Sequence, residues 1–376
     1  MNNNTHISPQ QSNRKGFRWL LLSIAVVSVV ISGLNTDDNQ PEPYPLVYPA
    51  NFGGRITIPA DNPTTREGVA LGRMLFYEKK LSADNTLSCG SCHEQKLAFT
   101  DGKAFSVGVD KSLTARNSMA LVNLLWVRNF FWDGRSPGLE EQAVFPMTNP
   151  HEMGQSMEAS VRKLQQVPVY GTMFKKAFGT ANIDADKIRK ALAQFERTLI
   201  SADSPYDRYL AGTYQPTAQE LRGMNLFMEP PAPEKGIRGA NCGHCHGGPK
   251  TFKELFHNNG LDATPKDSGR EAVSNQAEDK GRFRVPTLRN IALTDPYMHD
   301  GRFKTLAEVL EHYNEHIQES PTLSSFLRGT SNEKGGKTLL LNQTEKADII
   351  AFLQMLTDKT FINNPAFSDP NKSLKQ

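Results

Sequence analysis

The sequence is poor in several features, and each shortage excludes a class of protein. Only four cysteines occur in 376 residues, which excludes a disulfide-stapled scaffold. A single long uncharged run occurs, which excludes a polytopic membrane protein. The 43 basic residues barely outnumber the 40 acidic ones, so the concentrated basic face of a nucleic-acid-binding protein is not expected. The remaining composition, 38% hydrophobic and 22% charged, fits a globular chain long enough for two domains.

The long uncharged run lies near the N-terminus. Residues 19–34 carry no charge, follow the basic residues Arg14, Lys15 and Arg18, and precede an acidic, proline-rich stretch. This order is typical of an export signal, although the run is short of the roughly 20 residues that a spanning helix needs. Residues 1–40 are therefore interpreted as a cleaved signal peptide or as an uncleaved membrane anchor with a linker. Both alternatives predict a periplasmic location for the rest of the chain.

The four cysteines form two short motifs. Residues 89–93 read Cys-Gly-Ser-Cys-His and residues 242–246 read Cys-Gly-His-Cys-His, so both match the C-x-x-C-H attachment motif of haem c. Two thiols at this spacing can add to the two vinyl groups of one haem, and the following histidine reaches the iron. A zinc site would not require a histidine after each cysteine pair. The sequence predicts two covalent haem c groups, bound by Cys89, Cys92, Cys242 and Cys245, with His93 and His246 as iron ligands.

A second pattern recurs 167 positions further along the chain. The repeated pairs are Leu121/Leu288, Asn123/Asn290, Asp133/Asp300, Gly134/Gly301, Arg135/Arg302, Leu139/Leu306 and Glu141/Glu308. Each set follows its own haem motif, which indicates a duplicated one-haem module. We expect two cytochrome c-like domains in tandem that face each other, over residues 41–215 and 216–376.

Helical periodicity dominates both parts of the chain. The apolar residues of 184–200 and of 344–356 each fall on one helical stripe. Capping boxes begin at Thr217 and at Thr305, which predicts helices over 217–228 and 305–317. The polar segment 262–280 is expected to be a surface loop. No stretch shows a long alternating pattern, so the fold class is predicted to be mainly α.

The chain resembles the bacterial dihaem cytochrome c peroxidases, including their MauG branch, over about residues 60–360. The strings that carry the resemblance are LGRMLFYEKKLSADNTLSCGSCH, TARNSMALVNL, FWDGRSPGLEEQA, NPHEMG, NCGHCHGG, RVPTLRNIALTDPYMHDGRF and TLAEVLEHY. The resemblance implies an N-terminal peroxidatic haem, a C-terminal electron-transfer haem and a calcium ion between them.

Within these strings, the resemblance implies roles for particular residues. Trp132 is similar to the family tryptophan that carries electrons between the haems, whereas Trp126 is expected to be a packing residue. Glu152 matches the distal glutamate that moves a proton during peroxide cleavage. Gln142 matches the distal glutamine, and Pro146 matches the pocket proline. His151, beside Glu152, is a chemical rival that the family pattern does not require.

The calcium ligands implied by the resemblance come from two segments. Asn117 would provide its side-chain oxygen, and Thr294 and Pro296 would provide backbone carbonyls, with water at the remaining positions. The side chain of Asp295 is not used in the family. None of these residues would be identified as a metal site from its own sequence context.

The first haem motif is followed by a departure from the better-studied peroxidases. Those enzymes carry a histidine in a context like S-I-G-H that blocks the peroxidatic iron until the other haem is reduced. This chain has Val109 at that point, in the string Ser-Val-Gly-Val. We therefore expect an open first haem, with Met119 as a weakly favoured rival ligand.

The second departure concerns the far ligand of the second haem. Where the better-studied enzymes use methionine, this chain has Tyr313, as the MauG branch does. Tyr313 shares an apolar helical stripe with Leu310 and Ile317, which predicts that it points inward. A tyrosine ligand stabilises ferric iron. A packed tyrosine remains an alternative, and His312 and Met298 are rival ligands.

Three functions are compatible with these predictions. The first is a peroxidase that reduces hydrogen peroxide to water without reductive activation, with electrons from a small cytochrome c or cupredoxin. The second is a MauG-like dihaem oxidant of a partner protein. The third is a non-enzymatic electron-transfer cytochrome, against which Glu152 and Gln142 argue. A homodimer is common in the family, and no feature of the sequence demonstrates one.

Overall fold

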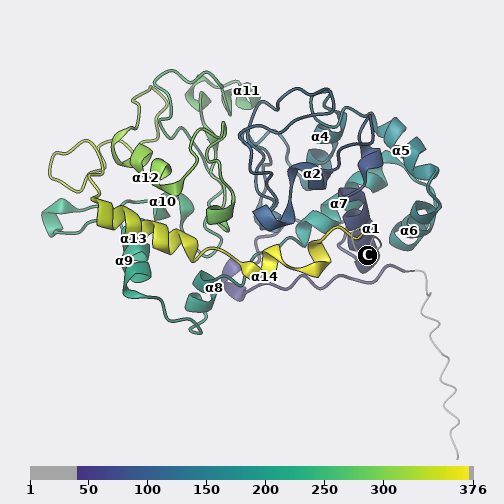
Figure 1. The fold of residues 1–376 in the computed structure, drawn as a ribbon, viewed down its shortest axis with the longest axis horizontal. Coiled ribbons are helices and arrows are strands. Elements are labelled where there is room, and N and C mark those ends of the chain that lie inside the picture. The colour runs from purple at the N-terminus through teal and green to yellow at the C-terminus, as the bar shows by residue number, and fades with distance from the viewer. Residues whose placement is uncertain (1–39, 372–376) are drawn as a thin grey trace, which may run out of the picture. The chain divides into compact units, whose positions relative to one another are not determined.

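Helices make up most of the regular structure in residues 40–371, the part of the chain that this computed structural model describes (Figure 1). In the first half (residues 40–215) they are α1 (Arg66–Phe76), α2 (Cys89–Cys92), α3 (Leu139–Gln142), α4 (Val144–Thr148), α5 (Met157–Gln165), α6 (Pro168–Phe178), α7 (Ala185–Arg197) and α8 (Pro205–Leu210). In the second half (residues 216–371) they are α9 (Ala218–Met228), α10 (Gly243–His246), α11 (Glu271–Ser274), α12 (Leu306–Glu315), α13 (Gln343–Gln354) and α14 (Lys359–Ile362).

Strands are minor in this fold. The two-residue strands β1 (Phe256–His257) and β2 (Phe283–Arg284) pair antiparallel, with Phe256 opposite Arg284. The predicted mainly α class is therefore confirmed. The leader predicted from residues 1–40 lies outside the described residues except for its last position. From residue 40 to residue 371, no helix has the length and apolar character needed to cross a membrane.

The predicted helices form close to their expected bounds. The side chain of Asp184 caps α7, and the residues of its predicted stripe are buried. Capping boxes begin α9 at Thr217 and α12 at Thr305, as expected. Helix α13 begins one residue early, because Asn342 caps it through the backbone N–H of Glu345. Helices α7 and α12 end a few residues before their predicted ends.

In each half, a pair of long helices packs at very close range. Helix α1 packs against α7, and a Cβ at Gly72 would lie 1.9 Å from the carbonyl oxygen of Ala191. Helix α9 packs against α13, and a Cβ at Gly223 would lie 1.8 Å from the carbonyl oxygen of Asp348. Glycine is therefore required at both crossings, because any side chain would push the helices apart.

The hydrophobic side chains form two buried clusters. The first includes Leu71, Phe76, Phe99 and Phe195, and the second includes Phe227, Leu310, Ile349 and Phe352. The packing crosses the predicted boundary between residues 215 and 216. Tyr206 joins the second cluster, whereas Phe361 and Phe367, near the C-terminus, join the first.

The predicted repeat has matching backbone geometry in its two copies. Asn123 and Asn290 are both fully buried, and both adopt left-handed conformations, with φ of 57° and 62°. Gly134 and Gly301 also match, with φ of 71° and 62°. Equivalent isolated bridges close the turn in each copy: Phe130 with Ser136, and Tyr297 with Phe303. The repeat is therefore a repeat of structure as well as of sequence.

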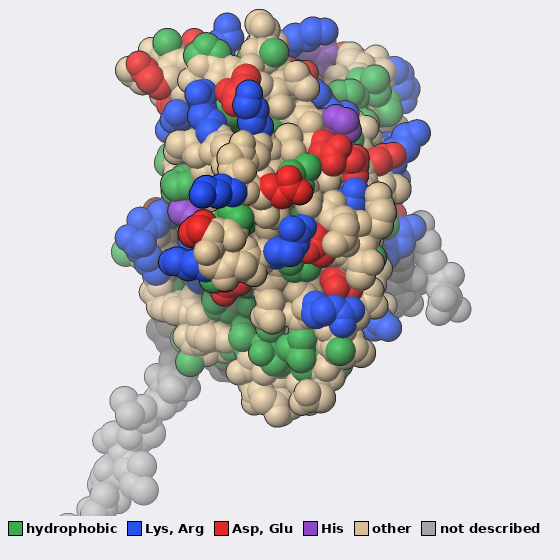
Figure 2. Space-filling view, turned by 90° about the vertical axis from the view of Figure 1, so that its left-hand side faces the viewer, with side chains coloured by type: hydrophobic (Ala, Val, Ile, Leu, Met, Phe, Trp, Pro, Cys, Tyr) green, Lys and Arg blue, Asp and Glu red, His purple; other side chains and the backbone are tan. Residues whose placement is uncertain are grey.

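The polar segment 262–280 is more ordered than a plain surface loop. It contains α11 and a short 3-10 helix over Ala277–Asp279. Its Asp267 carboxylate accepts two hydrogen bonds from Arg116, at 2.7 and 2.8 Å. This ion pair ties the segment to the first half. Figure 2 shows one face of the molecule, on which positive and negative side chains are interspersed.

Candidate haem sites

The first haem motif forms the short helix α2. The backbone N–H of Ser88 donates to the Ser91 hydroxyl at 3.0 Å, which helps to define the start of the helix. The Nδ1 atom of His93 lies 2.7 Å from the carbonyl oxygen of Phe99. Burial lowers the pKa of His93, so the ring is neutral and Nδ1 carries the donated proton. The other nitrogen, Nε2, is then free to bind a metal, as the predicted proximal role requires.

The second haem motif forms helix α10. Burial raises the pKa of the Cys242 thiol to about 12 and lowers the pKa of His246 to about 4. The Nδ1 atom of His246 is buried and makes no hydrogen bond with residues 40–371, although the carbonyls of Thr251 and Pro286 lie near the ring. His244, within the motif, packs its ring against Phe326 with the ring centres 3.5 Å apart.

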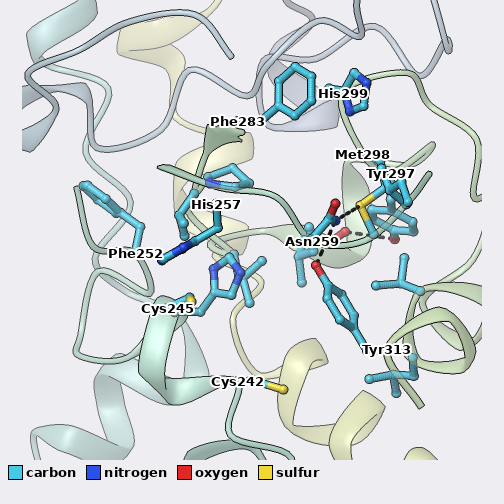
Figure 3. Close-up of a pocket in the computed structure, with 18 of the residues that line it drawn as sticks. Cys242, Cys245, Phe252, His257, Asn259, Phe283, Tyr297, Met298, His299 and Tyr313 are labelled. Atoms are coloured by element: carbon cyan, nitrogen blue, oxygen red, sulfur yellow. Dashed lines mark hydrogen bonds between the residues drawn. The ribbon is translucent and has the colours of Figure 1, made fainter. Parts of the chain in front are cut away.

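A cavity of about 430 Å³ opens beside the second motif (Figure 3). Cys242, Cys245 and His246 contribute to one part of its wall. The predicted stripe of α12 also lines the cavity: Leu306, Val309, Leu310, Tyr313 and Ile317. The helical periodicity therefore predicted correctly which face of α12 points inward. The size and apolar lining of the cavity fit a planar macrocycle held by the two cysteines.

Tyr313 and Met298 lie together on the cavity wall across from Cys245 (Figure 3). The Tyr313 hydroxyl accepts a hydrogen bond from Asn259 Nδ2 at 3.1 Å, and the Met298 sulfur accepts one from the same atom at 3.4 Å. Burial raises the pKa of Tyr313 to about 12, against the opposing effect of the Asn259 donor. The predicted ligand and its methionine rival are thus both at the site.

The histidine rival has a different environment. His312 is 4% exposed, and its Nε2 atom lies 3.0 Å from the carbonyl oxygen of Asn259. Its ring also packs against Phe303. His312 does not line the cavity. It therefore supports the wall that holds Tyr313 and Asn259 instead of competing with Tyr313.

A buried cation also lines the cavity. Arg284 is 6% exposed, and no carboxylate among the described residues lies within ion-pair distance of it. Its guanidinium has weak partners only: the Phe131 carbonyl at 3.3 Å and the Met119 sulfur at 3.5 Å. Burial lowers the pKa of Arg284 to about 10, while the negative charge of Glu254 acts in the opposite direction. A buried guanidinium without an ion pair to any of residues 40–371 fits an anionic group in the cavity, such as a haem propionate.

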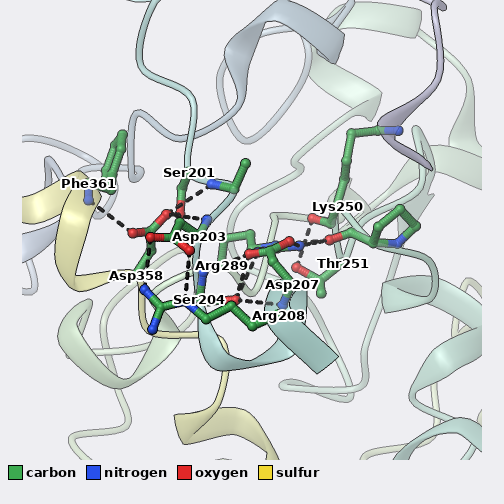
Figure 4. A network of polar contacts seen from close by, with 12 residues as sticks. Ser201, Asp203, Ser204, Asp207, Arg208, Lys250, Thr251, Arg289, Asp358 and Phe361 are labelled. Carbon is green, nitrogen blue, oxygen red and sulfur yellow. Dashed lines mark hydrogen bonds and ion pairs between the residues drawn. The ribbon is translucent and has the colours of Figure 1, made fainter. Parts of the chain in front are cut away.

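A polar network holds the loop that follows the second haem motif (Figure 4). Arg289 donates from Nε to the Pro249 carbonyl at 2.9 Å and from Nη2 to the Asp207 carboxylate at 2.6 Å. The Asp358 carboxylate accepts from Ser201 Oγ at 3.0 Å and from the Phe361 backbone N–H at 3.0 Å. The network fixes the loop against α8 and the chain end. Breaking a buried pair of this kind costs about 3–5 kcal/mol.

Trp132 lies where the first half meets the cavity. Its Nε1–H donates to the Asn117 carbonyl at 2.9 Å, and its ring stands edge-on to His299 with centres 6.5 Å apart. Trp132 and His299 occupy equivalent positions of the repeat. His299 in turn stacks on Phe283 at 3.8 Å. By contrast, Trp126 is 4% exposed and donates to the Gly53 carbonyl at 3.0 Å, so its predicted packing role is confirmed.

Glu152 lies close enough to the first motif for its negative charge to help raise the pKa of the Cys92 thiol. Asn149 Nδ2 donates to its Oε1 atom at 2.8 Å. Burial raises the pKa of Glu152, while the Asn149 donor and the charge of Arg135 act in the opposite direction. Gln142 ends α3, and its side chain makes no hydrogen bond within residues 40–371. Pro146 lies within α4.

His151 and Val109 lie beside Glu152. The Nδ1 atom of His151 lies 2.7 Å from Asp110, and its side chain is 63% exposed, so it faces solvent. The Val109 backbone N–H donates to the Glu152 carbonyl at 2.9 Å. A Cβ at Gly108 would lie 2.1 Å from the His151 carbonyl oxygen. Glycine at this position therefore allows the loop to lie close against the 151–154 turn.

The predicted calcium ligands converge on the same cavity. Asn117, Thr294 and Pro296 all line it. The Asn117 amide nitrogen donates to the Lys103 carbonyl at 2.8 Å, and its Oδ1 atom accepts no hydrogen bond from residues 40–371. The carbonyls of Thr294 and Pro296 accept no hydrogen bond from residues 40–371. Within that range, no group of three or more His, Cys, Asp or Glu side chains forms a metal cluster. Oxygen atoms of amides and carbonyls suit calcium.

Three site residues were missed from the sequence. Asn259 and Arg284 come from segments without helical periodicity, and Asn149 is three residues before Glu152 in a turn. For Arg284, a signal existed: it lies in the string RVPTLRN, where a charged residue borders an apolar run. No sequence signal marks Asn259, because its contacts are formed across the chain.

Comparisons with known proteins identify the family of this chain. The family model for di-haem cytochrome c peroxidase matches residues 66–215. Methylamine utilization protein MauG from Methylophilus methylotrophus is 32% identical over 341 residues, which are 90% of this chain and 95% of that protein. Cytochrome c551 peroxidase from Nitrosomonas europaea is 36% identical over 305 residues, 80% of this chain and 83% of that protein.

A solved structure supports the same assignment. The crystal structure of a MauG-like protein associated with microbial copper homeostasis superposes with a TM-score of 0.77 and 34% identity, covering 87% of this chain and 99% of that chain. The diheme peroxidase BthA from Burkholderia thailandensis, at 22% identity and a TM-score of 0.66, shares the fold. The chain belongs to the di-haem cytochrome c peroxidase family, whose two haem c groups fit the two attachment helices.

Proposed function

We propose that the protein is a dihaem peroxidase that reduces hydrogen peroxide to water, consuming two electrons and two protons per peroxide. The observation that carries this proposal is the position of Glu152. Its carboxylate lies near the first attachment helix, is held through Oε1 by Asn149, and has a pKa raised by burial. Burial favours the protonated form of a carboxyl group, and a carboxylate that lies beside the substrate can accept a proton and return it. Family membership supports the same activity.

The residues of the chain have distinct tasks in this reaction. The bound haems supply the iron redox chemistry that splits the O–O bond and stores electrons. Glu152 Oε2, which Asn149 leaves free, takes the proton from the nearer peroxide oxygen and returns it to the farther one. The Gln142 amide, without a partner among the described residues, orients peroxide or water. These residues position protons and substrate only.

Electrons enter at the second site and reach the first through Trp132. Trp132 lines the cavity of the second site, and its indole N–H is fixed to the Asn117 carbonyl. The donor we propose is a small cytochrome c or cupredoxin of the periplasm. We also propose that each half carries one haem as a tandem module, that Asn117, Thr294 and Pro296 hold calcium, and that the enzyme functions outside the cytoplasm.

The first site is proposed to be open before any reduction. Val109 cannot bind iron, and the loop that carries it is tied to the turn of Glu152 by the Val109–Glu152 backbone hydrogen bond. His151 is bound to Asp110 at the surface. Met119 contacts Arg284 in the cavity beside the second motif. This loop therefore directs no strong iron ligand toward the first site.

A second candidate function is favoured by the position of Tyr313. Tyrosine ligation stabilises oxidised iron, so a chain with an open first site and a tyrosine at the second could store oxidising equivalents. Such a protein would oxidise a partner protein, as relatives named MauG are associated with methylamine utilization. The two candidates differ in turnover with small donors.

The test is to mix the fully oxidised, haem-loaded protein with hydrogen peroxide and record the haem spectrum on the millisecond scale. A rapid change is expected because the first site is open. Steady oxidation of a reduced small cytochrome c would then support the peroxidase. A long-lived oxidised state with poor donor turnover would support the partner-protein oxidant. No reaction with peroxide, even after one electron is added, would overturn both in favour of an electron-transfer cytochrome.

A further inference from the structure

Asn259 contacts both side chains that could serve as the far ligand at the second site. Its Nδ2 atom donates to Tyr313 Oη at 3.1 Å and to Met298 Sδ at 3.4 Å. Figure 3 shows both acceptors turned toward this one amide, across the cavity from Cys245. All three side chains line the cavity. One amide group therefore contacts both the Tyr313 oxygen and the Met298 sulfur, the two possible ligands.

The turn that carries Asn259 is fixed independently of its side chain. His312 Nε2 lies 3.0 Å from the Asn259 carbonyl oxygen, an arrangement in which the ring N–H donates. The neighbouring Asn258 side chain donates to Ser320 Oγ at 3.1 Å and to Thr322 Oγ1 at 2.9 Å. Asn258 Oδ1 also accepts from the backbone N–H of Gly260 at 2.8 Å. These bonds fix the backbone from which the Asn259 amide projects toward Tyr313 and Met298.

A fixed N–H donor does not treat oxygen and sulfur equally. Hydrogen bonds to an ionised oxygen are roughly twice as strong as neutral ones, whereas a thioether is a weak acceptor. The negative charge of a metal-bound tyrosinate is costly in a buried site unless donors face it. An amide aimed at Tyr313 Oη therefore favours the tyrosinate. Its contact with Met298 Sδ holds the sulfur beside the amide.

We infer that Asn259 is a positioning residue that selects Tyr313 over Met298 as the far ligand of the second haem. The inference rests on the proposed function, in which the second site holds a tyrosine-ligated haem. Outer-shell hydrogen bonds commonly set the orientation and electronic character of metal ligands. Here the donor also affects which residue binds the iron, because the Met298 sulfur, a possible ligand of different chemistry, accepts from the same amide.

The test replaces the donor and measures the ligand directly. Asn259→Leu keeps the approximate size of the side chain, removes both N–H groups, and leaves the His312 contact with the backbone carbonyl intact. The oxidised variant should lose iron–tyrosinate resonance Raman bands at one haem, and the midpoint potential of that haem should become more positive, because methionine favours ferrous iron. Asn259→Asp, close in shape to asparagine, provides a second variant with the same expected direction.

Two controls make the outcome specific. Met298→Leu alone should leave the bands and the potential as in the parent protein, because Tyr313 is already the ligand. Asn259→Leu combined with Met298→Leu should recover the tyrosinate bands, because the competing sulfur is absent. A set of spectra and potentials that does not change with either Asn259 variant would overturn the inference.

Tyr313→Phe separates this inference from the proposed function. If Tyr313→Phe leaves both haem spectra unchanged, tyrosine is not the ligand and the proposed arrangement of the second site fails. If Tyr313→Phe changes one haem spectrum while the Asn259 variants do not, only the selecting role of Asn259 fails.

Discussion

The two attachment helices differ in how the histidine that follows the second cysteine is held. At the first site, His93 Nδ1 lies 2.7 Å from the Phe99 carbonyl. At the second, His246 Nδ1 is buried without a hydrogen bond to residues 40–371. A histidine that donates from one nitrogen is a more basic ligand through the other. The same attachment motif therefore places its histidine in two different environments, which would give the two haem irons ligands of different basicity.

The far sides of the two sites differ even more. Beside the first motif lies Glu152, the proposed proton-transfer group, with Val109 in the adjacent loop. Beside the second lie Tyr313 and Met298, two ligand-type side chains that share one amide donor. In the proposed function, the first site carries out the peroxide chemistry and the second site stores electrons. The predictions below test this division.

The largest effect is expected for Glu152→Gln. The glutamine keeps the size of the side chain but cannot take a proton, so the reaction of oxidised protein with peroxide should slow by about 10²–10⁴-fold. The haem spectrum at rest should not change. Glu158→Gln, at an exposed residue of α5, is the matched control and should react at the parental rate. Stopped-flow spectroscopy would measure both, and a full-rate Glu152→Gln variant would remove this residue from the mechanism.

Substitutions of the two tryptophans should have different effects, one mainly on electron transfer and the other mainly on stability. Trp132→Phe should slow electron transfer from the second site to the first, with an unfolding free energy lowered by only about 0.5–1.5 kcal/mol for one lost hydrogen bond. Trp126→Phe removes a hydrogen bond and buried edge-on contacts with Tyr48 and Phe52.

Trp126→Phe should therefore destabilise the fold by about 1–3 kcal/mol and leave electron transfer unchanged. The measurements are reoxidation of the half-reduced protein by peroxide and denaturant unfolding. Equal electron-transfer rates in parent and Trp132→Phe proteins would contradict the proposed path.

The decrease in the rate of the peroxide reaction at low pH should follow the protonation of Glu152. The carboxylate is the proton acceptor, so the rate falls as the pH falls through the pKa of Glu152, which burial raises. Asn149→Asp removes the Nδ2 donor, adds a negative charge, and keeps the acceptor for the His151 backbone N–H. It should raise the pKa further and move the acid limb to higher pH. A limb that moves instead with His151→Gln would identify His151 as the acceptor.

The effect expected from calcium is on the stability of the fold. Binding at Asn117, Thr294 and Pro296 would stabilise the folded state by about 2.7 kcal/mol when the free calcium concentration is 100 times the dissociation constant. Thermal unfolding with calcium or with a chelator should show this difference. Asn117→Ala should abolish it, whereas Asp295→Ala should not. A calcium effect that survives in Asn117→Ala would place the ion elsewhere.

Some of the site could be predicted because local patterns carry it. The C-x-x-C-H strings predicted where the haem groups attach, and the apolar stripe of α12 predicted that Tyr313 faces the cavity. The recurrence of Asn123 as Asn290 predicted a duplicated module, and the two asparagines do adopt the same left-handed backbone conformation. Local hydrogen bonding and helical periodicity dictate these features, so the sequence is sufficient for them.

Other features depend on contacts between distant segments. Asn259 meets Tyr313 only after folding, and Arg284 becomes buried only when the cavity closes around it. The C-terminal residues Phe361 and Phe367 join the first hydrophobic cluster, which no periodicity could reveal. The boundary predicted between residues 215 and 216 stays a prediction, because buried side chains on either side of it join both clusters.

The most direct test of the division between the two sites is a low-temperature electron paramagnetic resonance spectrum of the fully oxidised, haem-loaded protein. An open first iron and a second iron ligated by His246 and Tyr313 predict one high-spin and one low-spin ferric signal, present in equal amounts before any reduction. Two low-spin signals would mean that a side chain still closes the first site, and would contradict the account.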